Sequence, residues 1–255
     1  MFDIRRAVSV LIIGSSCLCA GICIAVPASA PTTSAAVDDG EQGLPTEAVQ
    51  KRGSKAEQFL KLHQQFLNRI RQGPIDLLFI GDSITAGWAS RAQDIWDKYY
   101  GPHNAANFGI GGDRTQHILW RINNGELDGI KPKVIVLMIG TNNTGRDSPE
   151  EIAAGVEKIV ATIRTKLPET KILLLGVFPR MKGYEKQGVK IAPINSLIGK
   201  LDDGKMVRYL DIGEKFKDAD GKIPLDVMPD GLHPSAKGYQ IWADAMQPLL
   251  SEMMK

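Results

Sequence analysis

Residues 75–83 read Ile-Asp-Leu-Leu-Phe-Ile-Gly-Asp-Ser, an apolar run that stops at a glycine. Such a run is typical of a buried strand, and Gly81 permits a sharp turn where a side chain would clash. Similar runs predict four more strands, at 105–108, 134–139, 172–177 and 206–210. Between and around them, apolar residues at helical spacing predict helices at 57–71, 91–99, 116–122, 149–166, 191–201 and 236–253.

Apolar strands that alternate with helices predict an α/β fold. The expected architecture is a three-layer sandwich with a central, mostly parallel five-stranded sheet covered on both faces. Ligands bind such sheets beyond the carboxyl ends of the strands. Residues with catalytic chemistry should therefore follow the strands directly.

The first thirty residues have a different composition from the rest. Arg5 and Arg6 precede an apolar run over 7–26, and small residues follow at 28–30, which is the order of a secretory signal. Residues 31–52 hold few large apolar side chains and are expected to form a flexible leader. We therefore expect a signal peptide at 1–30, a leader at 31–52 and one folded domain at 53–255.

A cleaved signal predicts an exported protein, periplasmic or extracellular, without stable membrane insertion. The cleavage site stays open. An uncleaved segment is the alternative, because the apolar run approaches the ~20 residues that span a bilayer. All three cysteines lie at 17, 19 and 23, inside this segment. The remainder of the chain therefore has no disulfide, no thiol nucleophile and no cysteine–zinc site.

The charge pattern excludes some classes of partner. The formal net charge is +2, which is too small to indicate nucleic acid or an anionic membrane as partner. The short basic patch at 51–55 is interpreted as the solvated start of a helix rather than as a binding site.

Ser83 follows the first predicted strand, at a strand-to-helix junction. A serine hydroxyl is a weak nucleophile unless a base takes its proton, so a catalytic Ser83 needs a histidine within hydrogen-bond reach. The alternative is that Ser83 only caps a helix, since serine is a preferred N-cap residue.

Two further blocks follow the second and third strands. Residues 107–113 read Asn-Phe-Gly-Ile-Gly-Gly-Asp, which fails the dinucleotide pattern because Arg114 stands where the third glycine belongs. An exposed amide of this loop can donate to a developing oxyanion. Gly140-Thr141-Asn142 follows the third strand, and an uncharged asparagine amide suits the same task. A turn asparagine bonded to its own backbone is the alternative.

The last block, Asp230-Gly231-Leu232-His233, precedes the final predicted helix, with Ser235 as the expected N-cap. A carboxylate three residues before a histidine can accept from the imidazole Nδ1–H. The other ring nitrogen of His233 is then free to take the Ser83 proton. The remaining histidines, His63, His103 and His117, are expected to have surface or packing roles.

The ordered set of blocks resembles the SGNH (GDSL-type) hydrolase superfamily. The matching residues are Gly-Asp-Ser at 81–83, the loop at 109–112, Gly-Thr-Asn at 140–142 and Asp-x-x-His at 230–233. Within the superfamily the chain is most similar to the catalytic subunits of the platelet-activating-factor acetylhydrolase Ib type. The shared strings are Asn-Phe-Gly-Ile-Gly-Gly-Asp at 107–113 and Leu-Trp-Arg at 119–121. The resemblance covers roughly residues 70–250 and implies the flavodoxin-like SGNH hydrolase fold.

By this resemblance the catalytic triad is Ser83, Asp230 and His233. The oxyanion hole would consist of the Ser83 amide, the Gly112 amide and the Asn142 side chain. The resemblance implies ester hydrolysis through an acyl-enzyme, with no cofactor and no metal. Members of this type dimerise, so a homodimer is possible. The mammalian subunits are intracellular, whereas the N-terminal segment of this chain resembles an export signal.

The substrate is less defined by sequence. We expect a short acyl group, in particular acetyl, on a small-molecule or glycan alcohol, because no long amphipathic lid separates the blocks. A lysophospholipid or short-chain lipid ester is the alternative substrate. An acyltransferase and a non-catalytic glycan-binding module on the same fold are the alternatives from other classes. Trp88 and Trp120 are candidates to line the site, with buried packing as the competing role.

Overall fold

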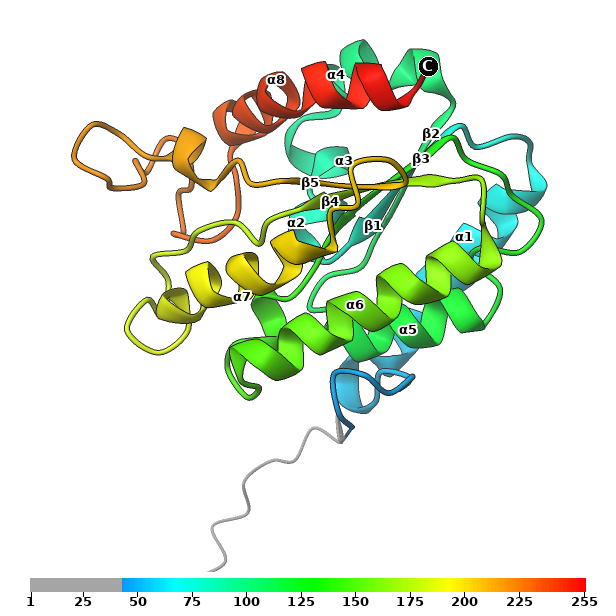
Figure 1. Ribbon diagram of the computed structural model, residues 1–255, viewed down its shortest axis with the longest axis horizontal. Coiled ribbons are helices and arrows are strands. Elements are labelled where there is room, and N and C mark those ends of the chain that lie inside the picture. The colour runs from blue at the N-terminus through cyan, green and yellow to red at the C-terminus, as the bar shows by residue number, and fades with distance from the viewer. Residues whose placement is uncertain (1–42) are drawn as a thin grey trace, which may run out of the picture. The chain divides into compact units, whose positions relative to one another are not determined.

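The computed structural model describes residues 43–255 (Figure 1). At its centre lies a five-stranded sheet with the order β2-β1-β3-β4-β5, in which every neighbouring pair is parallel. This confirms the α/β fold predicted from sequence. The strands are β1 Leu77–Gly81, β2 Ala105–Gly109, β3 Val134–Met138, β4 Lys171–Leu175 and β5 Val207–Leu210.

The helices follow the predicted pattern with one correction. The helix expected over 91–99 begins instead at Gln93, because Ala92 has a φ of −153° and a ψ of 37°, which are not helical, and Arg91 ends a separate short helix. The α-helices are α1 Ala56–Arg71, α2 Ser83–Ala86, α3 Trp88–Arg91, α4 Gln93–Tyr99, α5 Thr115–Asn123, α6 Pro149–Lys166, α7 Ile191–Ile198 and α8 Ala236–Met253.

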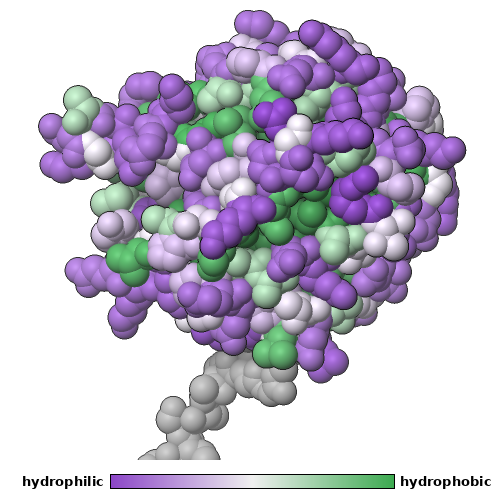
Figure 2. All heavy atoms as spheres, in the orientation of Figure 1, coloured by the Kyte–Doolittle hydropathy of each residue, from purple (hydrophilic) through white to green (hydrophobic). Residues whose placement is uncertain are grey.

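The helices form layers on both faces of the sheet (Figure 1). Successive side chains of a strand point to opposite faces, so Leu78 and Ile80 join one core while Leu77 and Phe79 join the other. The first core packs against α1, α5, α6 and α7, and the second packs against α2, α3, α4 and α8. Figure 2 shows that hydrophilic side chains cover most of one face of the molecule.

Two helix starts occur where the sequence predicted them. Ser148 Oγ accepts from the Glu151 amide at 3.2 Å, and the Glu151 carboxylate accepts from the Ser148 amide at 2.8 Å, which is a capping box for α6. Ser235 Oγ accepts from the Gly238 amide at 3.3 Å. The second cap fixes the start of α8 at Ala236, three residues after His233.

Residues 43–52, which we call the N-terminal strap, were predicted to be part of a flexible leader, and the structure corrects this. The Val49 amide donates to the Gln116 carbonyl at 3.1 Å, and the Lys51 side chain is 1 % exposed. The segment packs because Lys51 finds buried acceptors, so the folded domain begins upstream of residue 53. The predicted signal peptide, residues 1–30, lies outside the described residues.

Within residues 43–255, no helix has both the length and the apolar character that crossing a membrane requires. In the same range, no group of three or more His, Cys, Asp or Glu side chains is placed to hold a metal ion.

Candidate active site

Ser83 is the first residue of α2, directly after β1. Asp82 caps this helix, since its Oδ1 accepts from the Ile84 amide at 2.9 Å. Ser83 is therefore not the cap, and its side chain points elsewhere: Oγ lies 2.9 Å from His233 Nε2. A histidine therefore lies within hydrogen-bond reach of Ser83, as a catalytic role of Ser83 requires.

Asp230 orients His233. The second ring nitrogen, Nδ1, lies 2.7 Å from Asp230 Oδ2, and the other carboxylate oxygen accepts from the amides of Leu232 at 3.0 Å and His233 at 2.7 Å. Partial burial acts to raise the pKa of Asp230, but the hydrogen bonds from His233 and Leu232 outweigh it and hold that pKa below its usual value. Asp230 is thus a carboxylate that can fix the imidazole tautomer.

Two hydrogen bonds connect the histidine loop with α3 and helix α8 with the nucleophile helix α2. The Arg91 guanidinium donates to the Pro234 carbonyl at 3.3 Å, and the buried Tyr239 hydroxyl of α8 donates to the Ile84 carbonyl at 2.6 Å. Sequence reasoning missed both residues, because neither lies in a recognised block. They connect the elements next to Ser83 with the elements next to His233, two residues that are far apart in the chain.

The glycine loop after β2 lies beside the nucleophile. A Cβ on Gly111 would come 3.9 Å from Ser83 Cβ, and Gly112 has a φ of +74°, which favours glycine. Within residues 43–255, neither the Ser83 amide nor the Gly112 amide has a hydrogen-bond partner. Both amides can therefore donate to a substrate oxygen.

Asn142 lies after β3, in a 3₁₀ turn at Thr141–Asn143. Its Nδ2 donates to the Asp113 carbonyl at 2.9 Å and to Asp82 Oδ2 at 3.3 Å. The turn-asparagine alternative is therefore wrong, since these partners lie on two other loops. To serve an oxyanion, Asn142 must exchange one of these contacts for substrate, and the 3.3 Å contact is the weaker one.

Asp82 is a site residue whose role the sequence did not reveal. It is fully buried, and burial raises its pKa to about 7, with the nearby Asp113 charge adding to the rise. The Ile84 amide and the Lys51 ammonium act in the opposite direction. The only sequence signal was its place between Gly81 and Ser83.

A buried cluster of charges lies behind the glycine loop. Asp113 contacts Lys51 Nζ at 2.9 Å and Arg121 Nε at 3.0 Å, and Arg121 also donates to Glu126 at 2.6 Å. All four side chains are at most 1 % exposed. The interpretation of residues 51–55 as a solvated helix start is thus wrong for Lys51, because the Asp113 carboxylate holds its ammonium inside.

The other histidines have packing roles where the structure shows their contacts. His63 Nδ1 lies 2.8 Å from Glu126 Oε1, and the ring of His117 accepts from the Arg114 amide at 3.0 Å. Burial, with the positive charges of Lys51 and Arg114, lowers the pKa of His117 to about 2, so that ring stays neutral. Trp88 is fully buried and cannot line an open site.

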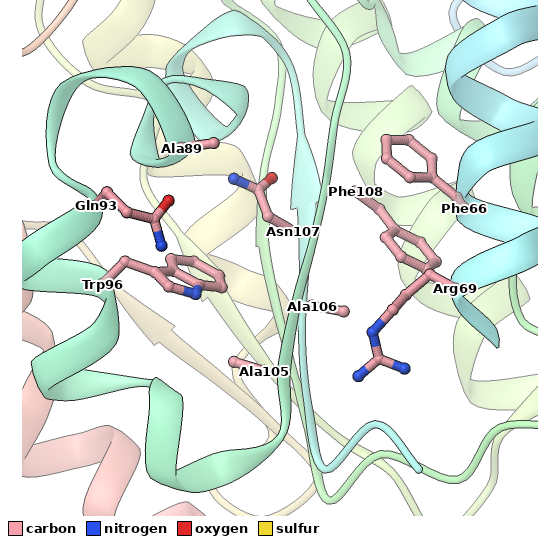
Figure 3. Close-up of a pocket in the computed structure, with 9 residues that line it drawn as sticks. All are labelled: Phe66, Arg69, Ala89, Gln93, Trp96, Ala105, Ala106, Asn107 and Phe108. Carbon is pink, nitrogen blue, oxygen red and sulfur yellow. The ribbon is translucent and has the colours of Figure 1, made fainter. Parts of the chain in front are cut away.

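A cavity of about 240 Å³ opens at the outer edge of β2, between α1 and the α3–α4 segment (Figure 3). None of the predicted site residues lines it. One lining residue, Asn107, still matters to the site, because its Nδ2 donates to the Thr85 carbonyl at 2.8 Å and its Oδ1 accepts from the Gly109 amide at 2.9 Å. Asn107 thereby connects the glycine loop to the Ser83 helix.

A parallel α/β sheet with a Ser–His–Asp hydrogen-bond chain at the carboxyl ends of its strands has the geometry of the serine hydrolase class. The sequence model of the GDSL-like Lipase/Acylhydrolase family matches residues 79–241. The chain belongs to this family, and it is a carboxylic ester hydrolase.

Curated relatives cover nearly the whole chain. The human platelet-activating factor acetylhydrolase IB subunit alpha2 is 36% identical over 220 residues, 86% of this chain and 93% of the relative. The human subunit alpha1 is 33% identical over 229 residues, 89% of this chain and 91% of the relative.

Solved structures share the fold at low sequence identity. A GDSL-like lipase from Bacteroides thetaiotaomicron has a TM-score of 0.60 at 18% identity, covering 76% of this chain and 98% of its own. A variant of an acetyl-xylooligosaccharide esterase from Geobacillus Stearmophilus has a TM-score of 0.55 at 20% identity, covering 69% of this chain and 93% of its own. These likenesses support the fold alone.

The comparisons correct the predicted localisation. The curated relatives, matched over most of this chain, are subunits of the intracellular acetylhydrolase type, so the expectation of an exported protein is contradicted. The expectation rested on the composition of residues 1–30, which has the order of a signal without proving that it acts as one.

Proposed function

We propose that this chain hydrolyses short-chain esters, in particular acetyl esters of carbohydrate, through a Ser83–His233–Asp230 triad. The observation that carries the proposal is the continuous hydrogen-bond chain from Ser83 Oγ through both ring nitrogens of His233 to Asp230. The acetyl preference is supported by the names of the curated relatives at 36% and 33% identity, which are acetylhydrolase subunits.

The reaction has two steps. His233 Nε2 takes the proton of Ser83 Oγ while that oxygen bonds to the acyl carbon, and the resulting imidazolium then protonates the leaving alcohol. Water enters, gives its proton to His233 and attacks the acyl-enzyme. The Ser83–acyl bond breaks, and Ser83 regains its proton from His233. Asp230 stays ionised throughout and stabilises the imidazolium.

The tetrahedral oxyanion would be bound by the Ser83 amide, the Gly112 amide and Asn142 Nδ2. The two amides are unpartnered within residues 43–255, which leaves their hydrogens available. Loss of one donor costs on the order of 100-fold in turnover. An Asn142→Ala variant should therefore lose about 100-fold in kcat with KM little changed.

A second cavity supports a sugar alcohol as leaving group. It has a volume of about 410 Å³ and lies after β4 and β5, with Tyr184, Asp211 and Glu214 in its lining. Its wall residue Arg180 donates to Thr141, next to Asn142, at 3.2 Å. Carboxylates and an aromatic ring offer hydrogen bonds and stacking to a pyranose.

One observation favours the lipid-ester alternative. Met181, Tyr184 and Val189 are about half exposed on the loop between β4 and α7. The amides of Met181 and Lys182 donate to the Gly231 carbonyl, so this apolar loop borders the histidine loop. Such a surface could receive an acyl or alkyl chain. Capture of the acyl group by a sugar hydroxyl would instead make the chain an acyltransferase.

The test compares the full chain with Ser83→Ala on p-nitrophenyl acetate, butyrate and octanoate. We expect turnover of acetate that falls with chain length and disappears in the variant. Acetylated xylooligosaccharides and short-chain phospholipids then separate the two substrate classes, and product analysis separates hydrolysis from transfer. Activity that survives in Ser83→Ala would overturn the triad. A preference for octanoate would place the lipid substrate first.

A further inference from the structure

Lys51 is an unusual residue for its position. It belongs to the N-terminal strap and lies outside residues 79–241, which match the family model. Yet its side chain is 1 % exposed, and its ammonium donates to the Gly111 carbonyl at 3.0 Å and to Asp113 Oδ1 at 2.9 Å. A lysine is rarely so buried unless paired, because removing its charge from water is costly.

The two acceptors of Lys51 flank one residue, Gly112. Lys51 thus holds the Gly111 carbonyl and the Asp113 side chain, and we call this pair of hydrogen bonds the clamp. Because the clamp fixes the residues on both sides of Gly112, the orientation of the Gly112 amide depends on it. Glycine has the most backbone freedom of any residue, and at a φ of +74° Gly112 has no side chain to restrain it.

The same clamp reaches the second oxyanion donor. Asn142 Nδ2 donates to the backbone carbonyl of Asp113 at 2.9 Å, and the Asp113 carboxylate is held by Lys51 and Arg121. A shift of Asp113 would therefore move the partner that orients Asn142. An error of about 1 Å in such groups can cost on the order of 100-fold in rate.

We propose that Lys51 is a positioning residue for the oxyanion hole, so that the N-terminal strap forms part of the active site. This inference rests on the proposed function, because it assumes that Gly112 and Asn142 bind the oxyanion. Lys51 touches neither substrate nor Ser83 in this role. It acts by fixing Gly111 and Asp113, and its loss should slow the chemical step more than it weakens substrate binding.

The competing explanation is charge balance alone. Lys51 and Arg121 carry two positive charges against the two negative charges of Asp113 and Glu126. Removing Lys51 leaves excess negative charge in a buried place, which would destabilise the fold without any catalytic role. The test must therefore separate lost charge balance from lost positioning.

Three variants of the full chain make this separation. Lys51→Met removes the clamp and unbalances the cluster. Lys51→Met with Asp113→Asn removes the clamp but restores the balance. Thr170→Val removes a buried hydrogen bond to the Pro132 carbonyl, 2.7 Å long, at the amino end of β4, and serves as a control for lost stability.

We expect Lys51→Met to lower kcat for p-nitrophenyl acetate about tenfold, with KM within about twofold of wild type. The double variant should unfold at a urea concentration near that of wild type and still show the tenfold loss. Thr170→Val should lose stability and keep its kcat. If Lys51→Met does not fold, the double variant is compared with Asp113→Asn alone, and equal kcat values in these two variants would overturn the inference.

A double variant with wild-type kcat would overturn the inference and leave charge balance as the role of Lys51. A wild-type kcat in folded Lys51→Met would do the same. These results are distinct from failure of the proposed function, which is seen as activity that persists in Ser83→Ala. Loss in Ser83→Ala with full activity in the double variant would remove only the role of Lys51.

Discussion

The two halves of the candidate active site are held by different forces. Ser83 and His233 lie on the side of the sheet where aromatic rings pack together, with Trp88 centred 4.5 Å from Tyr239 and 5.0 Å from Trp242. The loop of Gly112 and the Asn142 amide are instead held by contacts with Asp113, whose carboxylate is bound by the buried Lys51 and Arg121. Figure 1 shows the helices of the two sides, α8 and α4 on one and α5 and α6 on the other.

This difference has a physical consequence. Apolar packing is non-directional and stabilises in proportion to the area buried, whereas a buried ion pair needs good geometry to offset the loss of hydration. Changes that reduce only the apolar packing on the aromatic side, and keep the hydrogen bond from Tyr239 to Ile84, should therefore reduce stability and leave the rate intact. Changes among the buried charges should reduce both, because the same contacts orient the oxyanion donors.

The largest expected effect belongs to Asp230→Asn. The amide keeps the shape of the carboxylate but favours the wrong tautomer of His233, which costs about 10⁴-fold in kcat in a comparable triad. We expect a loss of about 10³–10⁴-fold on p-nitrophenyl acetate, with a small fall in the urea midpoint, because the folded chain stabilises the Asp230 carboxylate but leaves it 41 % exposed. A loss of kcat below tenfold would show that catalysis by His233 does not depend on the Asp230 carboxylate.

Arg121→Met should have the next largest effect, and it tests the charged half. Removing one partner of a buried ion pair costs about 3–5 kcal/mol, here because Asp113 and Glu126 lose their shared cation. We expect a loss of this size by urea unfolding, together with a lower kcat in the fraction that remains folded. A variant as active and stable as wild type would contradict the comparison.

The fold could be predicted from sequence because its signals are local, whereas the triad of Ser83, Asp230 and His233 was implied by the resemblance to the SGNH hydrolases. Apolar runs such as 77–81 mark strands, and the spacing of Asp230 and His233 places a carboxylate near an imidazole. The contacts of Lys51 could not be predicted, since its acceptors lie 60 and 62 residues away in the chain. Burial of a charge depends on tertiary neighbours, and composition alone therefore suggested a solvated patch.

The break in the helical backbone at Ala92 could not be predicted from sequence either. Helical spacing continues from 91 to 99, but the backbone at Ala92 leaves the helical region. Trp88 of α3 and Trp96 of α4, on either side of this break, both pack against Phe79. A periodic pattern identifies the face that will be buried. It does not reveal where the chain must bend to bury it.

Trp88→Phe tests the aromatic half with a smaller change. The variant loses part of a fully buried ring system, but it also removes an indole nitrogen that has no hydrogen-bond partner within residues 43–255. We expect a stability loss of about 1–2 kcal/mol by urea unfolding and a kcat within twofold of wild type. A large fall in kcat would show that aromatic packing also sets the catalytic geometry.

The smallest expected effect concerns Asp82, which lies where the two halves meet, since Oδ1 caps the Ser83 helix and Oδ2 contacts Asn142. Burial raises the pKa of Asp82 to about 7, with Asp113 adding to the rise and Lys51 opposing it. The folded chain therefore holds a proton that the unfolded chain releases above about pH 4. Because the folded state binds more protons in this window, stability falls as the pH rises toward 7 and levels off above it.

Asp82→Asn removes this dependence while keeping an oxygen to cap α2. The free energy of unfolding of the variant, relative to wild type, should rise by on the order of 1 kcal/mol between pH 6 and pH 8, measured by urea unfolding. A difference that stays constant over this range would mean that Asp82 is ionised in the folded chain at both pH values. In that case Asp82 would carry a charge at both pH values, and Asn142 would donate to a carboxylate.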